Sequence, residues 1–340
     1  MSSAEQFERS PWPHRWAVVL ACATFPLVWV GGLVTTTDAG MAVPDWPTTY
    51  GYNLFLYPWQ TWLLGPWDLF IEHGHRLLAA SVGMLTIGLL IALLRTEDRR
   101  WVKGLGFVAL ALVIFQGVLG GMRVRLDERT LAMLHGCTGP LFFALTVAMV
   151  VFTSSKWRAT GSASVPIIGN TAGNIRRLAA VTAVLAYLQI VLGAVLRHVP
   201  VDAQPSTFMH AVKSHLFLAA VLTIHIVLLA FLVLRNLRHT QPLAGLAQLL
   251  VTLLCFQLAL GAGTWLVKFA VPAWAAEWIS PQQIAVQQGG WLQTHVITAH
   301  VAIGSAILGT AVALALYTQR LLPSASTAHS IAHRKLGVAL

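Results

Sequence analysis

The sequence predicts an all-α polytopic membrane protein with eight transmembrane helices. Of its 340 residues, 56% are hydrophobic and only 10% are charged, and the mean hydropathy is +0.70. A soluble domain carries about 25% charged residues, so these values argue against a water-soluble protein and against a disordered chain. The apolar residues fall in blocks of about twenty, which is the length of a helix that crosses a bilayer.

Each apolar block is continuous rather than alternating, which favours helices over the strands of a membrane barrel. A Ser- and Gly-rich segment separates the first four blocks from the last four. We predict transmembrane helices at 16–35, 74–94, 103–121, 130–152, 178–196, 209–233, 246–268 and 295–317. The predicted parts are an N-terminal four-helix half at 1–152, a linker at 153–177, a C-terminal four-helix half at 178–320 and a tail at 321–340.

The charges indicate an orientation. If the N-terminus lies on side one, that side holds 15 of the 22 Lys and Arg residues and 4 of the 12 acids, a net charge of +11 against −1 on the other side. The positive-inside rule then makes both termini and the linker cytoplasmic. The net charge of +10 therefore reflects topology, and no nucleic-acid partner is expected. We see no cleavable signal or transit segment, so the expected location is a bacterial plasma membrane.

The three cysteines do not predict a metal site or a disulfide. Cys22, Cys137 and Cys255 are scattered along the chain and show no metal-binding spacing.

The odd-numbered spans share a short sequence near their outer ends. It reads FQGVLGG at 115–121, LQIVLGA at 188–194 and FQLALGA at 256–262, while the first span has FPLVWVGG without the Gln. Such an internal repeat indicates two related halves. Small residues at these places let helices approach closely, so the repeat is informative about fold more than about chemistry.

The even-numbered spans each carry a His near the outer end: His75, His135, His215 and His300. Each stands 20 or 21 residues before the first cytoplasmic basic residue. At about 1.5 Å per residue, all four imidazoles lie at one depth, about 30 Å from the cytoplasmic edge. A single such His is commonly a packing residue, but ionisable groups in membranes typically mark function, and imidazole is an axial ligand of haem iron. We predict one haem-sized site in each half, held by two His residues.

Two further histidines are alternative ligands. His210 and His295 each stand five residues before His215 and His300, which turns them about 140° away on the helix and places them about 7–8 Å further out. The depth count favours His215 and His300. His225 lies in the middle of its span and is expected to pack.

One acid is placed for chemistry. Glu72 precedes His75 by three residues, so both lie on one helix face, and Arg76 follows. A carboxylate beside an apolar pocket could handle protons, although an acid at a helix start is also favoured by the helix dipole. The corresponding positions in the C-terminal half are Val212 and Ile297. This asymmetry predicts chemistry in the N-terminal half and a redox cofactor in the C-terminal half.

At these residues the chain resembles the haem A synthase family. The resemblance is carried by GGLVTTTDAG and DWP after the first span, by Glu72-His73-Gly74-His75-Arg76, by QGVLGG, and by the outer His of each even-numbered span. It implies an enzyme that oxidises a methyl group of haem O to the formyl group of haem A for terminal oxidases. It also implies roles for the candidate residues: Glu72 as the catalytic acid, His75 and His135 around the substrate haem with Arg76 beside them, and His215 and His300 as axial ligands of a haem b cofactor.

The chain departs from this family in two places. Segment 36–71 has no Cys, whereas some bacterial members have a pair there. Leu216 and Val301 follow the C-terminal histidines where many relatives have Arg. The partners implied are haem O, membrane lipid, a haem O synthase, an electron donor and a second copy in a homo-oligomer.

Two other functions fit parts of the pattern. A diheme b-type cytochrome that carries electrons from quinol needs the same four histidines but gives Glu72 no special role. A proton-relaying transporter would use His and Glu, but the sequence lacks the broken mid-membrane helices typical of transporters.

Overall fold

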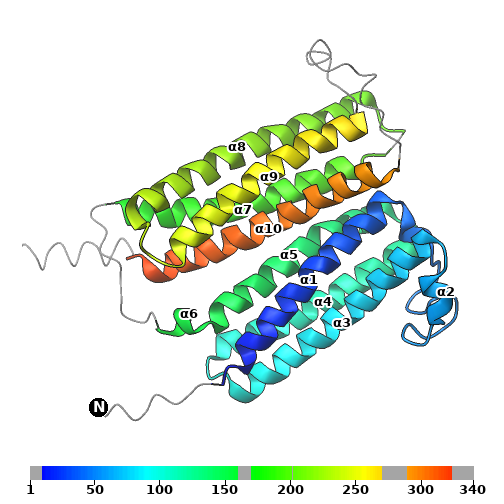
Figure 1. The fold of residues 1–340 in the computed structure, drawn as a ribbon, viewed down its shortest axis with the longest axis horizontal. Coiled ribbons are helices and arrows are strands. Elements are labelled where there is room, and N and C mark those ends of the chain that lie inside the picture. Colours follow the sequence, from blue (N-terminus) through cyan, green and yellow to red (C-terminus); the bar gives the residue numbers. More distant parts are fainter. Residues whose placement is uncertain (1–9, 160–169, 201, 270–288, 324–340) are drawn as a thin grey trace, which may run out of the picture. The chain divides into compact units, whose positions relative to one another are not determined.

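The computed structural model describes residues 10–159, 170–200, 202–269 and 289–323 (Figure 1). Within these ranges the chain is helical, apart from loops and an isolated bridge between Thr49 and Tyr52. The helices are α1 (Trp12–Thr36), η1 (Ala39–Met41), α2 (Trp59–Leu63), α3 (Trp67–Thr96), α4 (Arg100–Leu126), α5 (Arg129–Thr153), α6 (Ser155–Ala159), α7 (Thr171–Arg197), α8 (Pro205–Leu237), α9 (Leu243–Phe269) and α10 (Trp291–Leu321).

Eight of these helices, in the described part of the chain, are long and apolar enough to cross a membrane: α1, α3, α4, α5, α7, α8, α9 and α10. Each contains one predicted span and extends a few residues beyond it, so the predicted all-α polytopic class is confirmed. The linker was predicted to run to residue 177, whereas α7 already begins at Thr171. Linker residues 160–169 and tail residues 324–340 lie outside the described residues.

Proline and left-handed residues set several helix ends. Pro66 precedes α3 and Pro205 is the first residue of α8, where the missing N–H costs no helical hydrogen bond. Between α4 and α5, Asp127 adopts a left-handed conformation with φ of 46°.

The turn between α3 and α4 contains an ion pair. Glu97 and Arg99 lie 2.8 Å apart there.

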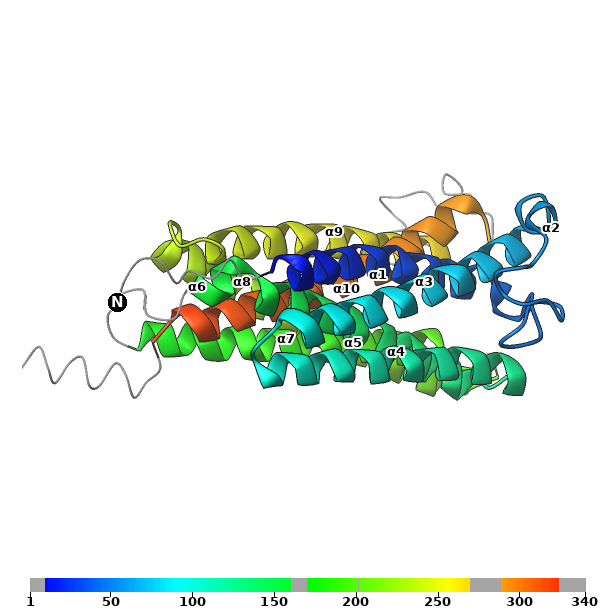
Figure 2. The same ribbon diagram turned by 90° about the horizontal axis from the view of Figure 1, so that it is seen from below.

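The chain forms two compact units. The first comprises residues 1–146 and 255–305, and the second comprises 147–254 and 306–340, so that α5, α9 and α10 contribute to both. In the first unit α3 packs against α1 and α4, and Figures 1 and 2 show these helices running side by side with α5. The rings of Phe25 and Phe143, 5.7 Å apart, join α1 to α5 and close a four-helix arrangement.

The first unit also includes the outer parts of α9 and α10. Thr36 at the end of α1 lies 3.3 Å from the Thr298 hydroxyl on α10. In the second unit α7 packs against α8, and Arg176 on α7 donates to the Gln319 side chain on α10 over 2.8 Å. The division of the chain into four-helix halves at 1–152 and 178–320 stays a prediction.

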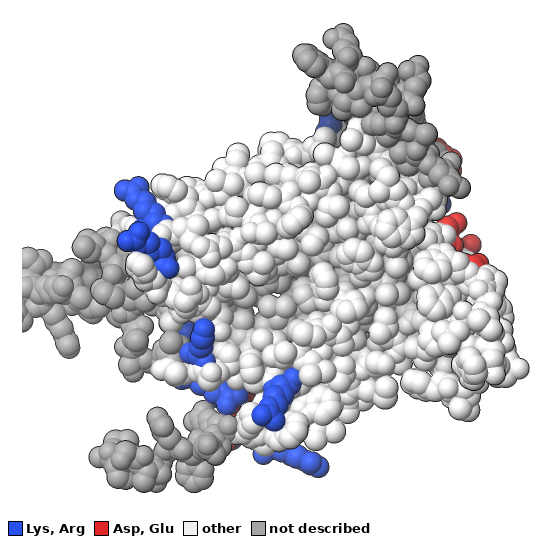
Figure 3. Space-filling model, in the orientation of Figure 1, with Lys and Arg blue, Asp and Glu red and all other residues white. Residues whose placement is uncertain are grey.

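The helix flanks carry exposed apolar side chains, as a lipid environment requires. Phe217 is 72% exposed and Ile224 is 64% exposed. On the face drawn in Figure 3 these flanks are almost without charge, and the Lys and Arg side chains lie at helix ends. All three cysteines are free.

Candidate functional site

Each predicted histidine lies near the start of its helix and faces a glycine on the long helix that precedes it. The histidines stand six to ten residues after the first residue of α3, α5, α8 and α10. A Cβ built on the facing glycine would lie 3.1–3.3 Å from the imidazole Cε1. The four pairs are Gly31 with His75, Gly120 with His135, Gly193 with His215, and Gly261 with His300.

His75 and His135 come together in the first unit. Their ring centroids are 6.3 Å apart and their planes are inclined at 85°. Two metal–nitrogen bonds of about 2.0 Å and two ring radii of about 1.1 Å would give about 6 Å, so the separation fits two imidazoles on opposite sides of one iron. In the described part of the chain no three His, Cys, Asp or Glu residues cluster to hold a bare metal ion. The pair therefore suits a metal whose other positions are already filled, as in haem.

The two imidazoles of this pair are held differently. His135 Nδ1 lies 3.1 Å from the Gln116 backbone carbonyl, to which it donates, so Nε2 is left as the available ligand atom. The Gln116 side chain donates to the His135 carbonyl over 3.2 Å and accepts from Thr138 over 2.7 Å. His75 Nδ1 is buried and, among the described residues, has no hydrogen-bond partner. His135 is thus fixed in orientation, whereas His75 is held by packing.

Glu72 is buried beside this pair but is already engaged. It is 2% exposed, and its Oε1 forms an ion pair of 2.8 Å with Arg76. Its Oε2 accepts the backbone N–H of Val43 over 2.9 Å. The carboxylate therefore links α3 to the loop that follows α1.

Arg76 ties down the same loop. Its terminal nitrogens donate to the carbonyls of Val43, Asp45 and Thr48 over 2.7–2.9 Å, as well as to Glu72. The structure thus places Arg76 in contact with the loop, and its predicted contact with the substrate stays a prediction.

Neighbouring residues complete the attachment. Arg123 donates to the Gly40 carbonyl over 2.9 Å, and a Cβ on Gly40 would overlap its guanidinium. Trp46 packs so closely on Gly121 that a Cβ there would overlap the indole. These contacts give a structural reason for the DAG and DWP sequences.

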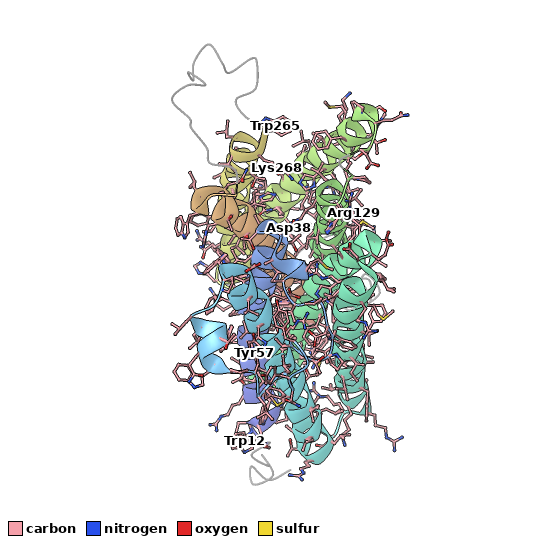
Figure 4. The ribbon with its side chains drawn as sticks, turned by 90° about the vertical axis from the view of Figure 1, so that its right-hand side faces the viewer. Trp12, Asp38, Tyr57, Arg129, Trp265 and Lys268 are labelled. Carbon is pink, nitrogen blue, oxygen red and sulfur yellow. The ribbon has the colours of Figure 1, made fainter. Side chains whose placement is uncertain are left out.

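The loop is also ordered by its own polar groups. Asp45 accepts from the Thr48 hydroxyl and from the N–H groups of Tyr50 and Gly51. Burial raises the pKa of Asp45, but these hydrogen bonds outweigh it and hold that pKa below 3.8. Figure 4 looks onto this end of the molecule and labels Asp38, just after α1, and Tyr57, whose ring lies 5.0 Å from that of buried His73.

The C-terminal histidines have comparable neighbours. In the second unit, Gln189 Nε2 lies 3.2 Å from His215 Nδ1 and 3.1 Å from the His215 carbonyl. In the first unit, His300 faces Gly261, and the amide of Gln257 lies against Gly304, one turn after His300. Gln189 and Gln257 thus stand against the His-bearing helix as Gln116 does.

The alternative histidines lie against their own helices. His210 Nδ1 is 2.6 Å from the Ser206 carbonyl, and His295 Nδ1 is 2.9 Å from the Trp291 carbonyl. His295 also stacks on the Trp291 ring with centroids 4.2 Å apart. His225 is similarly bonded to the Val221 carbonyl over 2.9 Å. None of these three faces a glycine of a neighbouring helix in the way that His215 and His300 do, within the described residues.

Sequence reasoning missed two kinds of residue at this site. The repeat marked Gly120, Gly193 and Gly261, but only as places of close helix approach. No sequence pattern indicated the loop carbonyls that Arg76 and Arg123 bind, because a backbone acceptor has no sequence signature.

Comparisons with known proteins agree with this geometry. A family model described as "Cytochrome oxidase assembly protein" matches residues 67–208. The haem A synthase of Shouchella clausii is 28% identical over 54% of this chain and 58% of its own length. That of Symbiobacterium thermophilum is 29% identical over 49% and 53%, and that of Shewanella oneidensis is 25% identical over 50% and 52%. Over about half its length the chain is thus similar to proteins named haem A synthase.

This chain spans about half the length of the haem A synthases that it matches. Residues 67–208 include Glu72, His75, Arg76 and His135, and end before His215 and His300. These bacterial haem A synthases and the eight membrane-spanning helices together indicate a multi-pass bacterial membrane protein.

Proposed function

We propose that this protein is a haem A synthase, which oxidises the methyl group of haem O to a formyl group and so supplies haem A for terminal oxidases. The observation that carries the proposal is the His75–His135 pair, whose ring centroids are 6.3 Å apart and which lies within the segment that the family model matches. The methyl carbon would be hydroxylated twice, each time with one molecule of oxygen: one oxygen atom would go to the carbon, and the other would be reduced to water by two electrons from the donor and two protons. The product of the second step, a hydrated aldehyde, would lose water to give the formyl group. Haem O would enter from the lipid, because its farnesyl tail is apolar.

His75 and His135 would hold the substrate haem from its two faces. His135, oriented by the Gln116 carbonyl, would be the fixed partner, and His75, with no hydrogen bond to its Nδ1 among the described residues, would be the adaptable one. Such a difference suits a site that must bind its haem and release it.

Glu72 would be the acid of the N-terminal site, and Arg76 would border the substrate. The carboxylate is buried and adjacent in sequence to the histidine face, which supports a role in proton transfer. Because Glu72 is tied to Val43 and Arg76, taking up a proton would weaken the contacts that hold the loop. Arg125 and Arg129 are exposed at this end of the first unit and would reach the propionates.

His215 and His300 would be the axial ligands of a haem b cofactor, which supplies one-electron transfer when it is bound. The support is the Gly–His pairing, which both histidines share with His75 and His135. Further partners would be a haem O synthase, which supplies the substrate, and an electron donor.

The test is to express the full chain with a haem O source, purify it and extract its haem. We expect a formyl haem in the wild type and haem b without the formyl product in Glu72→Gln, whose carboxamide cannot carry the proton. Normal formyl product from Glu72→Gln would overturn the role of Glu72. Bound haem that is never modified by the wild type would overturn the synthase and favour the diheme b-type cytochrome.

A further inference from the structure

We propose that Gly31, Gly120, Gly193 and Gly261 are positioning residues, each of which sets the place of the opposing imidazole and thereby the ligand geometry of the bound haem. The inference rests on the proposed function, because it assumes that the imidazoles bind haem iron. It assigns a shared role to one glycine in each of the helices α1, α4, α7 and α9.

The contact is the same in all four pairs. A Cβ would lie 3.1 Å from Cε1 at Gly31 and Gly120, 3.3 Å at Gly193 and 3.2 Å at Gly261. Cε1 is the ring carbon between the two nitrogens, and the next nearest ring atom in every pair is Nδ1, so the glycine meets the ring beside Nε2 and not at Nε2 itself. The easiest relief of an added methyl group is a shift of the imidazole by a few tenths of an ångström, since the alternative is to move a helix backbone.

Such a shift is large for a metal ligand. Metal–nitrogen bonds of about 2.0 Å tolerate only about 0.2 Å of error. The imidazole of His135 is further constrained by its hydrogen bond to Gln116, which lies one turn before Gly120 on the same helix. The helix that carries the glycine therefore supplies a flat surface for the imidazole, and α4 also supplies the carbonyl that orients the His135 ring.

Not every glycine in these helices is in close contact with a neighbouring side chain. Gly117, three residues from Gly120 on α4, has no atom within 4 Å of its Cβ position, and neither has Gly136, next to His135. Gly173 on α7 is equally open, whereas Gly193 on the same helix faces His215. Other glycines, such as Gly106 and Gly121, contact Leu or Trp side chains, so what sets the four pairs apart is that the group contacted is an imidazole in every one. The open glycines provide matched controls.

The experiment compares Gly193→Ala with Gly173→Ala in the full-length protein purified with its haem. The readouts are the haem content by pyridine haemochrome, the low-spin signal by electron paramagnetic resonance, and monodispersity. We expect Gly173→Ala to match the wild type. Gly193→Ala should shift or lose the low-spin signal and retain haem on the order of tenfold less tightly, as for other residues that orient metal ligands. Gly120→Ala and Gly117→Ala form a second pair of variants, for which the same measurements are made with haem O bound.

Each outcome decides the inference. A wild-type signal from Gly193→Ala with haem bound would overturn it. Aggregation of both Gly193→Ala and Gly120→Ala would also overturn it, because it would make these glycines necessary for helix packing itself. A wild-type protein that binds no haem would instead refute the proposed function, so the two failures are distinct.

Discussion

The surroundings of the three glutamines differ by one hydroxyl group. The Gln116 oxygen accepts from Thr138, three residues after His135. The corresponding residues after His215 and His300 are Leu218 and Ile303. Accordingly, the oxygens of Gln189 and Gln257 are buried without a hydrogen-bond partner among the described residues. A buried acceptor without a donor is costly, although the Gln189 amide is held through its Nε2, which donates to the His215 carbonyl over 3.1 Å.

At this residue scale, the first prediction separates the C-terminal ligand from its alternative. His300→Ala should lose the low-spin b-type signal, because Ala has no ligand atom. His295→Ala should keep it, since His295 is bonded to its own helix and stacked on Trp291. Absorption and electron paramagnetic resonance spectra of the two purified variants check this. The reverse pattern would move the ligand to His295.

At the scale of elements, the loop after α1 is held by three side chains from two helices and by its own polar groups. Glu72 and Arg76 of α3 and Arg123 of α4 bind its backbone, and Asp45 gathers its turn. Since the same Glu72 is the proposed catalytic acid, the order of this loop and the chemistry of the site are coupled through one carboxylate.

Removing the Asp45 carboxylate should loosen this loop. In Asp45→Asn one oxygen becomes an amide that cannot accept, and a lost hydrogen bond of about 1 kcal/mol corresponds to about fivefold faster local hydrogen exchange at neutral pH. Because folding lowers the pKa of Asp45, its carboxylate stabilises the wild-type loop fully above pH 3.8 and loses this effect only as the pH falls through the lower folded-state pKa.

Hydrogen exchange of residues 43–52, followed by mass spectrometry, measures this effect. Asp68→Asn is the control, because Asp68 is exposed and bonds only to the adjacent Leu69 N–H. Equal exchange in wild type and Asp45→Asn at neutral pH would show that the carboxylate does not order the loop.

At the scale of the whole molecule, the charge asymmetry predicts cytoplasmic termini and an external first loop. With the native cysteines replaced by Ser, a full-length protein with Asn53→Cys should react with a membrane-impermeant maleimide in intact cells. His239→Cys, in the turn between α8 and α9, should react only after permeabilisation. Labelling of His239→Cys but not of Asn53→Cys in intact cells would invert the orientation.

Much of the architecture was predictable because a bilayer imposes it locally. A span must be about twenty apolar residues long whatever its neighbours are, so eight helices followed from eight apolar blocks. The even spacing of His75, His135, His215 and His300 from the basic residues was likewise a property of single helices. By contrast, residues 270–288, between α9 and α10, lie outside the described residues.

The sequence by itself therefore determined the apolar helices of the described chain, since each depends on composition along one segment, and the common depth of the four imidazoles stays a prediction. Only the tertiary structure decided that each imidazole rests on a glycine, that His75 meets His135, and that Arg76 binds the loop rather than standing open. These are contacts between groups from 15 to 60 residues apart in the sequence, several of them with backbone atoms, and the rotation of one helix against another sets them.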